Sequence, residues 1–168
     1  MSFSIREGRR SDAVAVADVY VVSRRAAYAD HLTPEQTESQ TPIEGARIWQ
    51  SLFTLARTAH LVVEDGEGIG GFATAGPIQG SGADPGTAEI YEFYVHPRLW
   101  GQGVSEQLLA RTLDVLRAKW FTHAVIWVVE GNEHARKFYE TEGWIDDGGR
   151  RASFRRVEVP SARYRMGL

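Results

Sequence analysis

The sequence predicts an α/β protein in which helices cover both faces of one mixed sheet. Residues 88–95 are β-branched and aromatic, as a buried strand prefers, and Pro97 ends them because proline cannot donate a ladder hydrogen bond. From Val104 onward, apolar residues recur at helical spacing. Residues 123–130 are apolar almost throughout, which fits a central strand buried on both faces. A strand, a loop and a helix within residues 88–109 therefore organise the rest of the chain.

The first half of the chain predicts a strand, three helices and a hairpin. Residues 3–7 alternate between apolar and polar, and Ser11 or Asp12 can cap a helix that runs to about Ala27. Pro34 stands in the first turn of a second helix, where proline is favoured. The remaining expected elements are a helix over 43–56, a strand over 59–64, a turn at 65–68 and a returning strand over 69–78.

The second half alternates strands and helices around the organising stretch. Asn132 can cap a helix that Gly143 ends. The expected elements are a loop at 79–87, a strand at 88–95, a glycine-containing loop at 98–103, a helix at 104–119, a strand at 123–130, a helix at 133–142, and strands within 144–159 and 162–168. The predicted order is therefore β-α-α-α-β-β-β-α-β-α-β-β.

Composition indicates a single domain over residues 1–168 that is soluble and cytoplasmic. A chain of 168 residues with 43% hydrophobic and 24% charged residues can bury a core without disorder. The net charge of -3 argues against a nucleic-acid partner. The absence of cysteine excludes a disulfide, a thiolate nucleophile and thiolate metal ligands, and the histidines show no metal-binding spacing. No apolar stretch is long enough for a signal peptide or a membrane span.

The loop at 98–103 has the properties of an anion site. The first N–H groups of a helix have no partner within it, and they lie at the positive end of the helix dipole. Gly101 and Gly103 carry no Cβ, so a phosphate could approach the backbone closely. The alternative is an ordinary strand-to-helix turn with two glycines. Taken alone, the short glycine motif favours that alternative.

Two stretches of the chain contain motifs that occur together in one protein family. The first is the loop Arg98-Leu-Trp-Gly-Gln-Gly103, and the second is Asn132-Glu-His-Ala-Arg-Lys-Phe-Tyr139, followed by Gly143-Trp144. With these two blocks in this order, the chain resembles the GNAT superfamily of N-acetyltransferases, whose acetyl-CoA signature, Gln/Arg-x-x-Gly-x-Gly/Ala, the loop fits. Ser105 is a mild departure, because glycine is common at that position. The resemblance covers essentially the whole chain.

The resemblance implies a mostly antiparallel sheet of six to seven strands, splayed in the middle, and an acetyl-CoA co-substrate without a metal. The backbone from Arg98 to Val104 would bind the pyrophosphate, and the Val95 N–H would contact the pantetheine arm and polarise the thioester. Asn132 would bind the arm, and Tyr139 would lie near the sulfur. The implied cofactor-binding residues are Val95, Arg98, Leu99, Trp100, Gly101, Gln102, Gly103, Val104, Ser105, Asn132 and Tyr139.

Acetyl transfer to an amine needs a proton acceptor and a donor for the leaving thiolate. Tyr139 is the candidate general acid; the alternative is a core aromatic residue beside Phe138. Glu89 and Glu92 are the candidate bases, with a charge at the rim of the sheet as the alternative. Because they stand three apart on a strand, we expect them on opposite faces unless a bulge intervenes. Glu89 is slightly favoured, since it matches the catalytic glutamate of the histone-acetylating members. For Asn132, helix capping alone is a sufficient explanation.

The amine acceptor stays open among a small amine, an amino acid, an antibiotic and a protein amine. Tyr28 and His31, in the break between the early helices, are candidates to line its pocket. A cluster of acids near these helices favours a cationic amine: Asp30, Glu35, Glu38 and Glu44. The arginines of the last strands instead fit a solvated hairpin: Arg150, Arg151, Arg155, Arg156, Arg163 and Arg165.

Two other classes of protein, and one assembly, are compatible with the sequence. One class is a GNAT-fold sensor that binds acyl-CoA without turnover, which an intact tyrosine and glutamate pair disfavours. The other is a nucleotide-phosphate enzyme, but the loop lacks both the following Gly-Lys-Ser/Thr and the third glycine of the dinucleotide motif. The resemblance also leaves room for a homodimer, because related proteins often pair their final strands between subunits.

Overall fold

The structure, a computed structural model, describes residues 2–38, 41–80, 83–154 and 157–168. Seven strands form one sheet in the order β1-β2-β3-β4-β5-β7-β6. They are β1 (Ser4–Glu7), β2 (Ala59–Asp65), β3 (Gly68–Pro77), β4 (Thr87–Val95), β5 (His123–Val129), β6 (Ile145–Arg151) and β7 (Ser161–Gly167). Strands β4 and β5 pair in parallel and the other pairs are antiparallel. The predicted mixed, mostly antiparallel sheet is confirmed.

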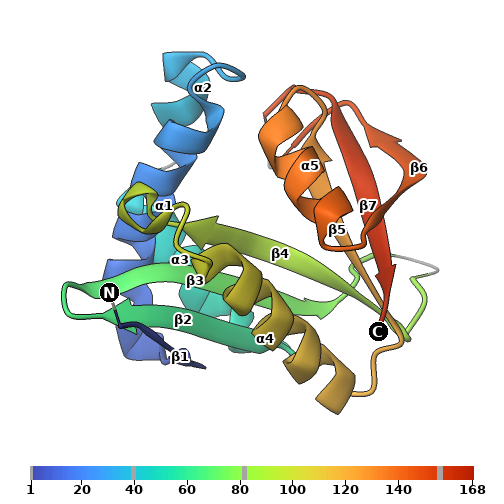
Figure 1. The fold of residues 1–168 in the computed structure, drawn as a ribbon, viewed down its shortest axis with the longest axis horizontal. Coiled ribbons are helices and arrows are strands. Elements are labelled where there is room, and N and C mark those ends of the chain that lie inside the picture. The colour runs from blue at the N-terminus through green and yellow to red at the C-terminus, as the bar shows by residue number, and fades with distance from the viewer. Residues whose placement is uncertain (1, 39–40, 81–82, 155–156) are drawn as a thin grey trace.

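Strands β4 and β5 separate along their length, as Figure 1 shows. In the described ranges their pairing joins Thr87, Ala88 and Glu89 to the first three residues of β5, and it stops there. Strand β4 nevertheless stays paired with β3 as far as Val95. Strand β5 likewise pairs with β7 over its full length. The sheet therefore divides into two well-paired halves that meet at one end and open at the other.

Helices cover both faces of the sheet, as predicted. On one face, α1 (Ala13–Tyr28) and α3 (Pro42–Leu52) pack in one apolar cluster with β2, β3 and β4. On the other face, α4 (Val104–Ala118) and α5 (Glu133–Thr141) contribute to the remaining core. The short α2 (Pro34–Glu38) extends beyond the end of α1 (Figure 1). No helix of the described residues is long and apolar enough to cross a bilayer.

A bulge in β4 changes which residues share a face. The register with β3 shifts between Thr74 and Ala75, so that Thr74 pairs with Glu92 and Ala75 pairs with Ile90. Tyr91 is the extra residue, and its hydroxyl donates a hydrogen bond to the Pro77 carbonyl. The alternation of side chains therefore restarts within the strand that borders the split.

Some boundaries differ from the predicted ones. Helix α3 ends at Leu52, four residues earlier than expected. A 3₁₀ turn, η1 (Arg10–Asp12), precedes α1, and the Asp12 carboxylate accepts hydrogen bonds from Arg6 and from the Arg9 N–H instead of capping α1. Only residues 145–151 of the expected stretch 144–159 form a long strand among the described residues, followed by one isolated bridge between Phe154 and Val157.

Candidate active site

A cleft of about 590 Å³ lies where β4 and β5 separate. Its two sides come from different elements, and we name them by their helices. The α4–α5 side includes Val95, Trp100, Gly101, Val104, Ser105, Asn132, Phe138 and Tyr139. The α1 side includes Ser23, Ala27, Tyr28, Asp30, His31, Trp127 and Phe154. The split in the sheet thus creates one continuous space that is open to two different groups of side chains.

Val95 presents its backbone to this cleft. The N–H of the next residue, His96, donates to the Gly70 carbonyl at 2.9 Å, on the β3 side. Successive backbone groups of a strand point to opposite neighbours, so the Val95 N–H and carbonyl point toward β5. Because β5 has diverged there, they face the cleft. The Val95 carbonyl accepts a hydrogen bond from Trp100 Nε1 at 2.7 Å, and Trp100 lines the cleft as well.

The loop after β4 uses its first N–H groups internally. Residues Pro97–Leu99 form a 3₁₀ turn, η2, in which the Arg98 N–H donates to His96 Nδ1 at 3.1 Å. The N–H groups of Leu99 and Trp100 donate to the carbonyls of His96 and Pro97. These three N–H groups are therefore occupied. The resemblance had implied that these N–H groups bind the pyrophosphate of CoA, together with the rest of the backbone from Arg98 to Val104.

The start of α4 offers the N–H groups that remain. The first hydrogen bond into the helix runs from the Gln107 N–H to the Gly103 carbonyl at 3.2 Å. The N–H groups of Val104, Ser105 and Glu106 precede it and have no partner within the helix. Gly103 caps the helix in the left-handed region, with φ of 74°, and no side chain caps this end. An uncapped, positively polarised helix start therefore borders the cleft.

Arg98 anchors the loop instead of pointing at a ligand. Its guanidinium forms an ion pair with Asp65, with Nη2 to Oδ1 at 3.1 Å, and the Asp65 side chain is only 3% exposed. This contact lowers the pKa of Asp65. Gly70 makes room for the loop, because a Cβ there would lie 2.5 Å from Leu99 Cδ1. Leu99 is a core residue, and Gln102 donates to the Arg98 carbonyl at 2.9 Å. The side chains of residues 98, 99 and 102 thus shape the loop.

Asn132 and Tyr139 come from α5 and line the same side of the cleft. The Asn132 Oδ1 accepts from the Ala135 N–H at 3.0 Å, so the predicted capping role is present. Tyr139 lies among aromatic rings, with Phe138 at 5.1 Å and Trp144 at 5.6 Å between centroids. Burial raises the pKa of Tyr139 well above its usual range. The phenol therefore stays protonated and can act as a hydrogen-bond donor.

Glu89 and Glu92 do not line the cleft. The sequence predicted that the two glutamates lie on opposite faces unless a bulge intervenes. The bulge at Tyr91 does intervene, and it places both glutamates on the face covered by α1 and α3. Glu92 is 8% exposed and borders a second cavity of about 10 Å³ together with Tyr20 and Thr74. That volume is enough for about one water molecule. Glu89 is half-buried near the end of β4 that pairs with β5.

The α1 side contains the two residues proposed for an acceptor pocket, Tyr28 and His31. Of the four acids expected there, Asp30 lines the cleft, Glu35 is exposed on α2 and Glu44 accepts the Thr41 N–H at the start of α3. The side chain of Glu38 lies outside the described residues, as do Arg155 and Arg156. Of the three acids whose side chains the structure describes, Asp30 is therefore the one that borders the cleft.

Sequence reasoning missed Trp127 and Phe154 on this side. Trp127 lies in an apolar strand, so the sequence predicts a core residue there. Phe154 lies within residues 144–159, which were expected to form a strand. Phe154 contacts Tyr28 with ring centroids 5.7 Å apart, which joins the end of α1 to the segment between β6 and β7. The alternation along β5 could have placed Trp127 on one face. The resemblance implied a splayed sheet, but no local pattern indicated that Trp127 lies beside the opening.

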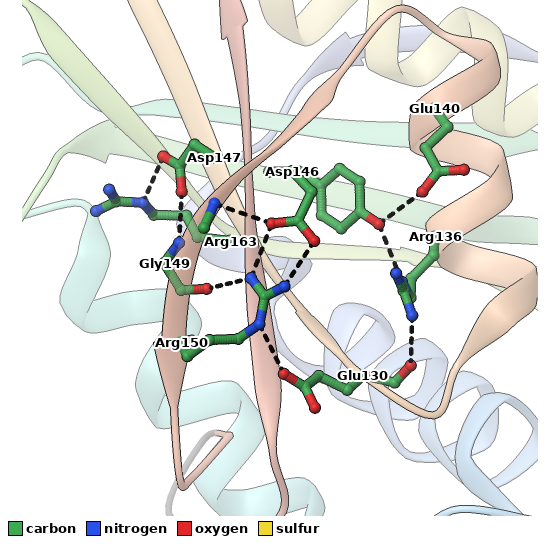
Figure 2. Close-up of polar contacts among 10 residues, drawn as sticks. Glu130, Arg136, Glu140, Asp146, Asp147, Gly149, Arg150 and Arg163 are labelled. Carbon is green, nitrogen blue, oxygen red and sulfur yellow. Dashed lines mark hydrogen bonds and ion pairs between the residues drawn. The ribbon is translucent and has the colours of Figure 1, made fainter.

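A polar network fixes α5 against the strands that follow it (Figure 2). The Arg136 Nε donates to the Tyr164 hydroxyl at 3.0 Å, and that hydroxyl donates to Glu140 at 2.8 Å. Arg150 of β6 forms an ion pair with Glu130 at 2.9 Å, at the end of β5. These contacts hold α5, and with it Asn132 and Tyr139, in a fixed position beside the split.

Residues 18–144 match the acetyltransferase (GNAT) family. The match covers most of the chain and both motif blocks, so the chain belongs to this family. The split sheet, the helix start and the cleft described above are consistent with that membership. Among the residues that the structure describes, no group of three histidine, aspartate or glutamate side chains is arranged to hold a metal ion.

Two curated relatives align with parts of the chain. The L-amino acid N-acyltransferase MnaT of Escherichia coli (strain K12) is 30% identical over 114 residues, which are 68% of this chain and 63% of MnaT. The mycothiol acetyltransferase of Beutenbergia cavernae is 39% identical over 61 residues, which are 36% of this chain and 20% of that protein. The alignments thus span less than two thirds of either relative.

Solved structures share the fold over almost their whole length. The PaiA N-acetyltransferase of Thermoplasma acidophilum, solved with coenzyme A, has a TM-score of 0.77 at 17% identity and covers 97% of this chain and 98% of its own. The yncA protein of Salmonella typhimurium, solved with acetyl-CoA, has a TM-score of 0.78 at 18% identity, covering 100% and 95%. The ribosomal-protein-alanine N-acetyltransferase of Brucella melitensis has a TM-score of 0.79 at 18% identity, covering 98% and 99%.

Proposed function

We propose that this protein transfers an acetyl group from acetyl-CoA directly to a primary amine, with both substrates bound in the cleft at once. The observation that carries the proposal is the opening between β4 and β5, which brings the Val95 N–H and the free helix start of α4 to one space. Membership of the acetyltransferase family and two structural neighbours solved with coenzyme A or acetyl-CoA support it.

The residues present fit acetyl-CoA on the α4–α5 side. We assign the phosphates to the N–H groups of residues 101–106, because those of residues 98–100 are already bonded within the loop. The Val95 N–H would contact the pantetheine arm and then the thioester carbonyl. Asn132 would use its side-chain N–H₂, since its oxygen caps α5. Trp100 and Ser105 would line the channel.

The transfer exchanges one acyl bond for another. The ammonium form of the acceptor loses a proton, the neutral amine forms a bond to the acetyl carbon, and the bond from that carbon to sulfur breaks. A second proton leaves the nitrogen, and the thiolate takes up a proton to become free CoA. An N–H donor at the acyl oxygen lowers the barrier because negative charge develops there. Acetyl-CoA supplies the activated acyl group, and the protein supplies donors, orientation and exclusion of water.

We assign Tyr139 as the donor to the departing sulfur. Because burial raises the pKa of Tyr139, the phenol keeps its proton and can donate a hydrogen bond to the thiolate as the bond to sulfur breaks. The proton removed from the amine would pass through water, since neither candidate glutamate lines the cleft. Glu92 is the better placed of the two, because it borders a cavity large enough for a water molecule beneath α1.

An acyl-CoA sensor is the second candidate, and one assay separates it from the enzyme. Release of free thiol from acetyl-CoA is followed with a panel of amines, amino acids, aminoglycosides and peptides. We expect amine-dependent thiol release together with a stoichiometric N-acetylated product. Tight CoA binding without turnover on any amine would favour the sensor. A larger shift of the melting temperature with ATP or NAD than with CoA would reject both.

A further inference from the structure

Arg24 of α1 is a buried arginine without an acidic partner among the described residues. The residue is 1% exposed, and its three guanidinium nitrogens are buried without a hydrogen bond of normal geometry in the described structure, while the Tyr94 side chain interacts with the guanidinium. The guanidinium carbon lies 5.4 Å from the centre of the Tyr28 ring and 5.9 Å from that of Tyr20. No acidic side chain of the described residues forms an ion pair with it. A buried, unpaired charge is costly, so its presence needs an explanation.

Two further unpaired donors line the cleft. The Ser23 hydroxyl is buried without a partner, and Ser23 lines the α1 side of the cleft. On the same side of the cleft, the Trp127 indole N–H is likewise buried without a partner, and Trp127 also lines the cleft. Ser23 comes from α1 and Trp127 from β5, and both lie on the α1 side of the cleft. The α1 side therefore has hydrogen-bond donors that lack an acceptor.

The charged groups around Trp127 are positive, as Arg24 is. The guanidinium carbon of Arg151 lies 3.8 Å from the centre of the Trp127 ring, and that of Arg163 lies 5.7 Å from it. Arg163 is balanced by Asp147, with Nε to Oδ2 at 2.8 Å. At the end of α1, Asp30 adds one carboxylate to the lining of the cleft. A molecule with both an anionic and a cationic group would match this arrangement.

We propose that the amine acceptor carries a carboxylate next to its amine, as an α-amino acid does. The carboxylate accepts hydrogen bonds from Ser23 and Trp127 in the positive field of Arg24, and the amine lies toward Val95. Arg24 is covered by tyrosine rings, so it is a positioning residue that acts through its charge. This inference rests on the proposed acetyl transfer and names the acceptor class for the same cleft.

The first test compares acceptors that differ only at the carboxylate. Leucine, leucinamide and 3-methylbutylamine share one side chain, and similar triplets cover aromatic and polar side chains. We expect kcat/KM for the preferred amino acid to exceed that for its amide by at least about tenfold. The amide has the less basic amine and so more of it is neutral, which means that amine basicity cannot produce this preference. Equal or better use of amides, simple amines or peptide N-termini would overturn the inference.

The second test changes the charge of Arg24. Arg24→Met should raise KM for the amino acid and bring the ratio of acid to amide close to one, while the KM for acetyl-CoA stays unchanged. Arg24→Lys keeps the charge and should restore most of the preference, which a merely structural role would not predict. Arg25→Met, at the exposed neighbouring position on α1, is the matched control and should behave as wild type. An unchanged ratio in Arg24→Met would contradict the inference.

A third measurement keeps the inference testable when Arg24→Met fails to fold or when no amine is acetylated. Ser23→Ala is a small change and should weaken binding of the amino acid several-fold but not that of the amide. Calorimetric titration of both ligands into the CoA-loaded protein reports this difference without turnover. If no amine is acetylated but the amino acid still binds more tightly than its amide, the proposed acetyl transfer is wrong and the carboxylate site stands. If neither the kinetic assay nor the titration shows a preference for the amino acid, the carboxylate site is wrong.

Discussion

At the scale of single residues, Tyr139 makes the most direct chemical prediction. Tyr139→Phe removes the donor to the leaving sulfur and keeps the ring that packs against Phe138 and Trp144. We expect kcat to fall by about 10²-fold, with little change in the affinity for CoA. Steady-state kinetics and calorimetry check this. A variant with wild-type kcat would remove Tyr139 from the mechanism and leave it as a core aromatic residue.

The two glutamates of β4 give a paired prediction. Glu92 borders the small cavity under α1 and Glu89 does not, so Glu92→Gln should lower kcat at neutral pH by at least about 10-fold and Glu89→Gln should change it less than twofold. Each variant serves as the control for the other, because both remove one charge from the same face of one strand. Equal, small effects would indicate that water alone removes the proton.

Residue identity alone could not settle the roles of these side chains. The second motif indicated that Asn132 and Tyr139 lie at one site, because both residues belong to the same short helix and the start and length of a helix can be predicted from local sequence. It could not indicate that Tyr91 bulges out of β4, since a bulge is defined by pairing with a distant strand. The burial of Arg24 had no signal either, because an arginine on an amphipathic helix ordinarily lies in solvent.

At the scale of elements, the helix start of α4 is the feature to test. Gly103→Val places a side chain at φ of 74°, where nothing but Gln107 lies nearby, so the new side chain would project toward a bound phosphate. We expect loss of CoA binding by at least about 10²-fold. Gly148→Val is the matched control, because Gly148 has φ of 85° in equally open space on β6. Both changes should cost about 1–2 kcal/mol of stability from backbone strain.

Only the variant in the loop should affect CoA. If Gly103→Val and Gly148→Val reduced stability alike and both bound CoA with wild-type affinity, the phosphate assignment would be wrong. The strand, loop and helix were predictable from local sequence. The internal use of the Arg98, Leu99 and Trp100 N–H groups was not, because a 3₁₀ turn after Pro97 differs from a plain loop only in its hydrogen bonds.

At the scale of the whole molecule, His60 links the core to pH. It stacks on Phe53 with ring centroids 4.0 Å apart, and burial lowers the pKa of His60 to about 4. The unfolded chain therefore binds more protons than the folded one between about pH 6.5 and 4, and stability falls as pH falls through that window. After allowance for partial exposure we expect a loss of about 1–2 kcal/mol.

His60→Asn removes this titration. Denaturant unfolding at pH 7, 5.5 and 4 should show a smaller loss of stability in the variant than in wild type over that window. An identical pH dependence in the two proteins would mean that other groups produce the acid sensitivity. The test uses stability alone, so it does not depend on any assignment in the cleft.

The overall architecture was largely predictable from sequence, whereas the shape of the cleft was not. Helix periodicity, strand composition and two family motifs determine the order of elements and the faces they cover. The opening depends on where the pairing of β4 and β5 stops, and no local pattern marks Glu89 as the last paired residue of β4. The division of the cleft into an α4–α5 side and an α1 side follows from that single structural fact.

The central claim is that both substrates occupy this cleft together and that the acetyl group passes directly between them. The most direct measurement is the initial rate with acetyl-CoA and a productive amine varied against each other. We expect double-reciprocal plots that intersect, as a ternary complex requires, and no acetylated protein after incubation with acetyl-CoA alone. Parallel lines together with a covalently acetylated protein would contradict the account.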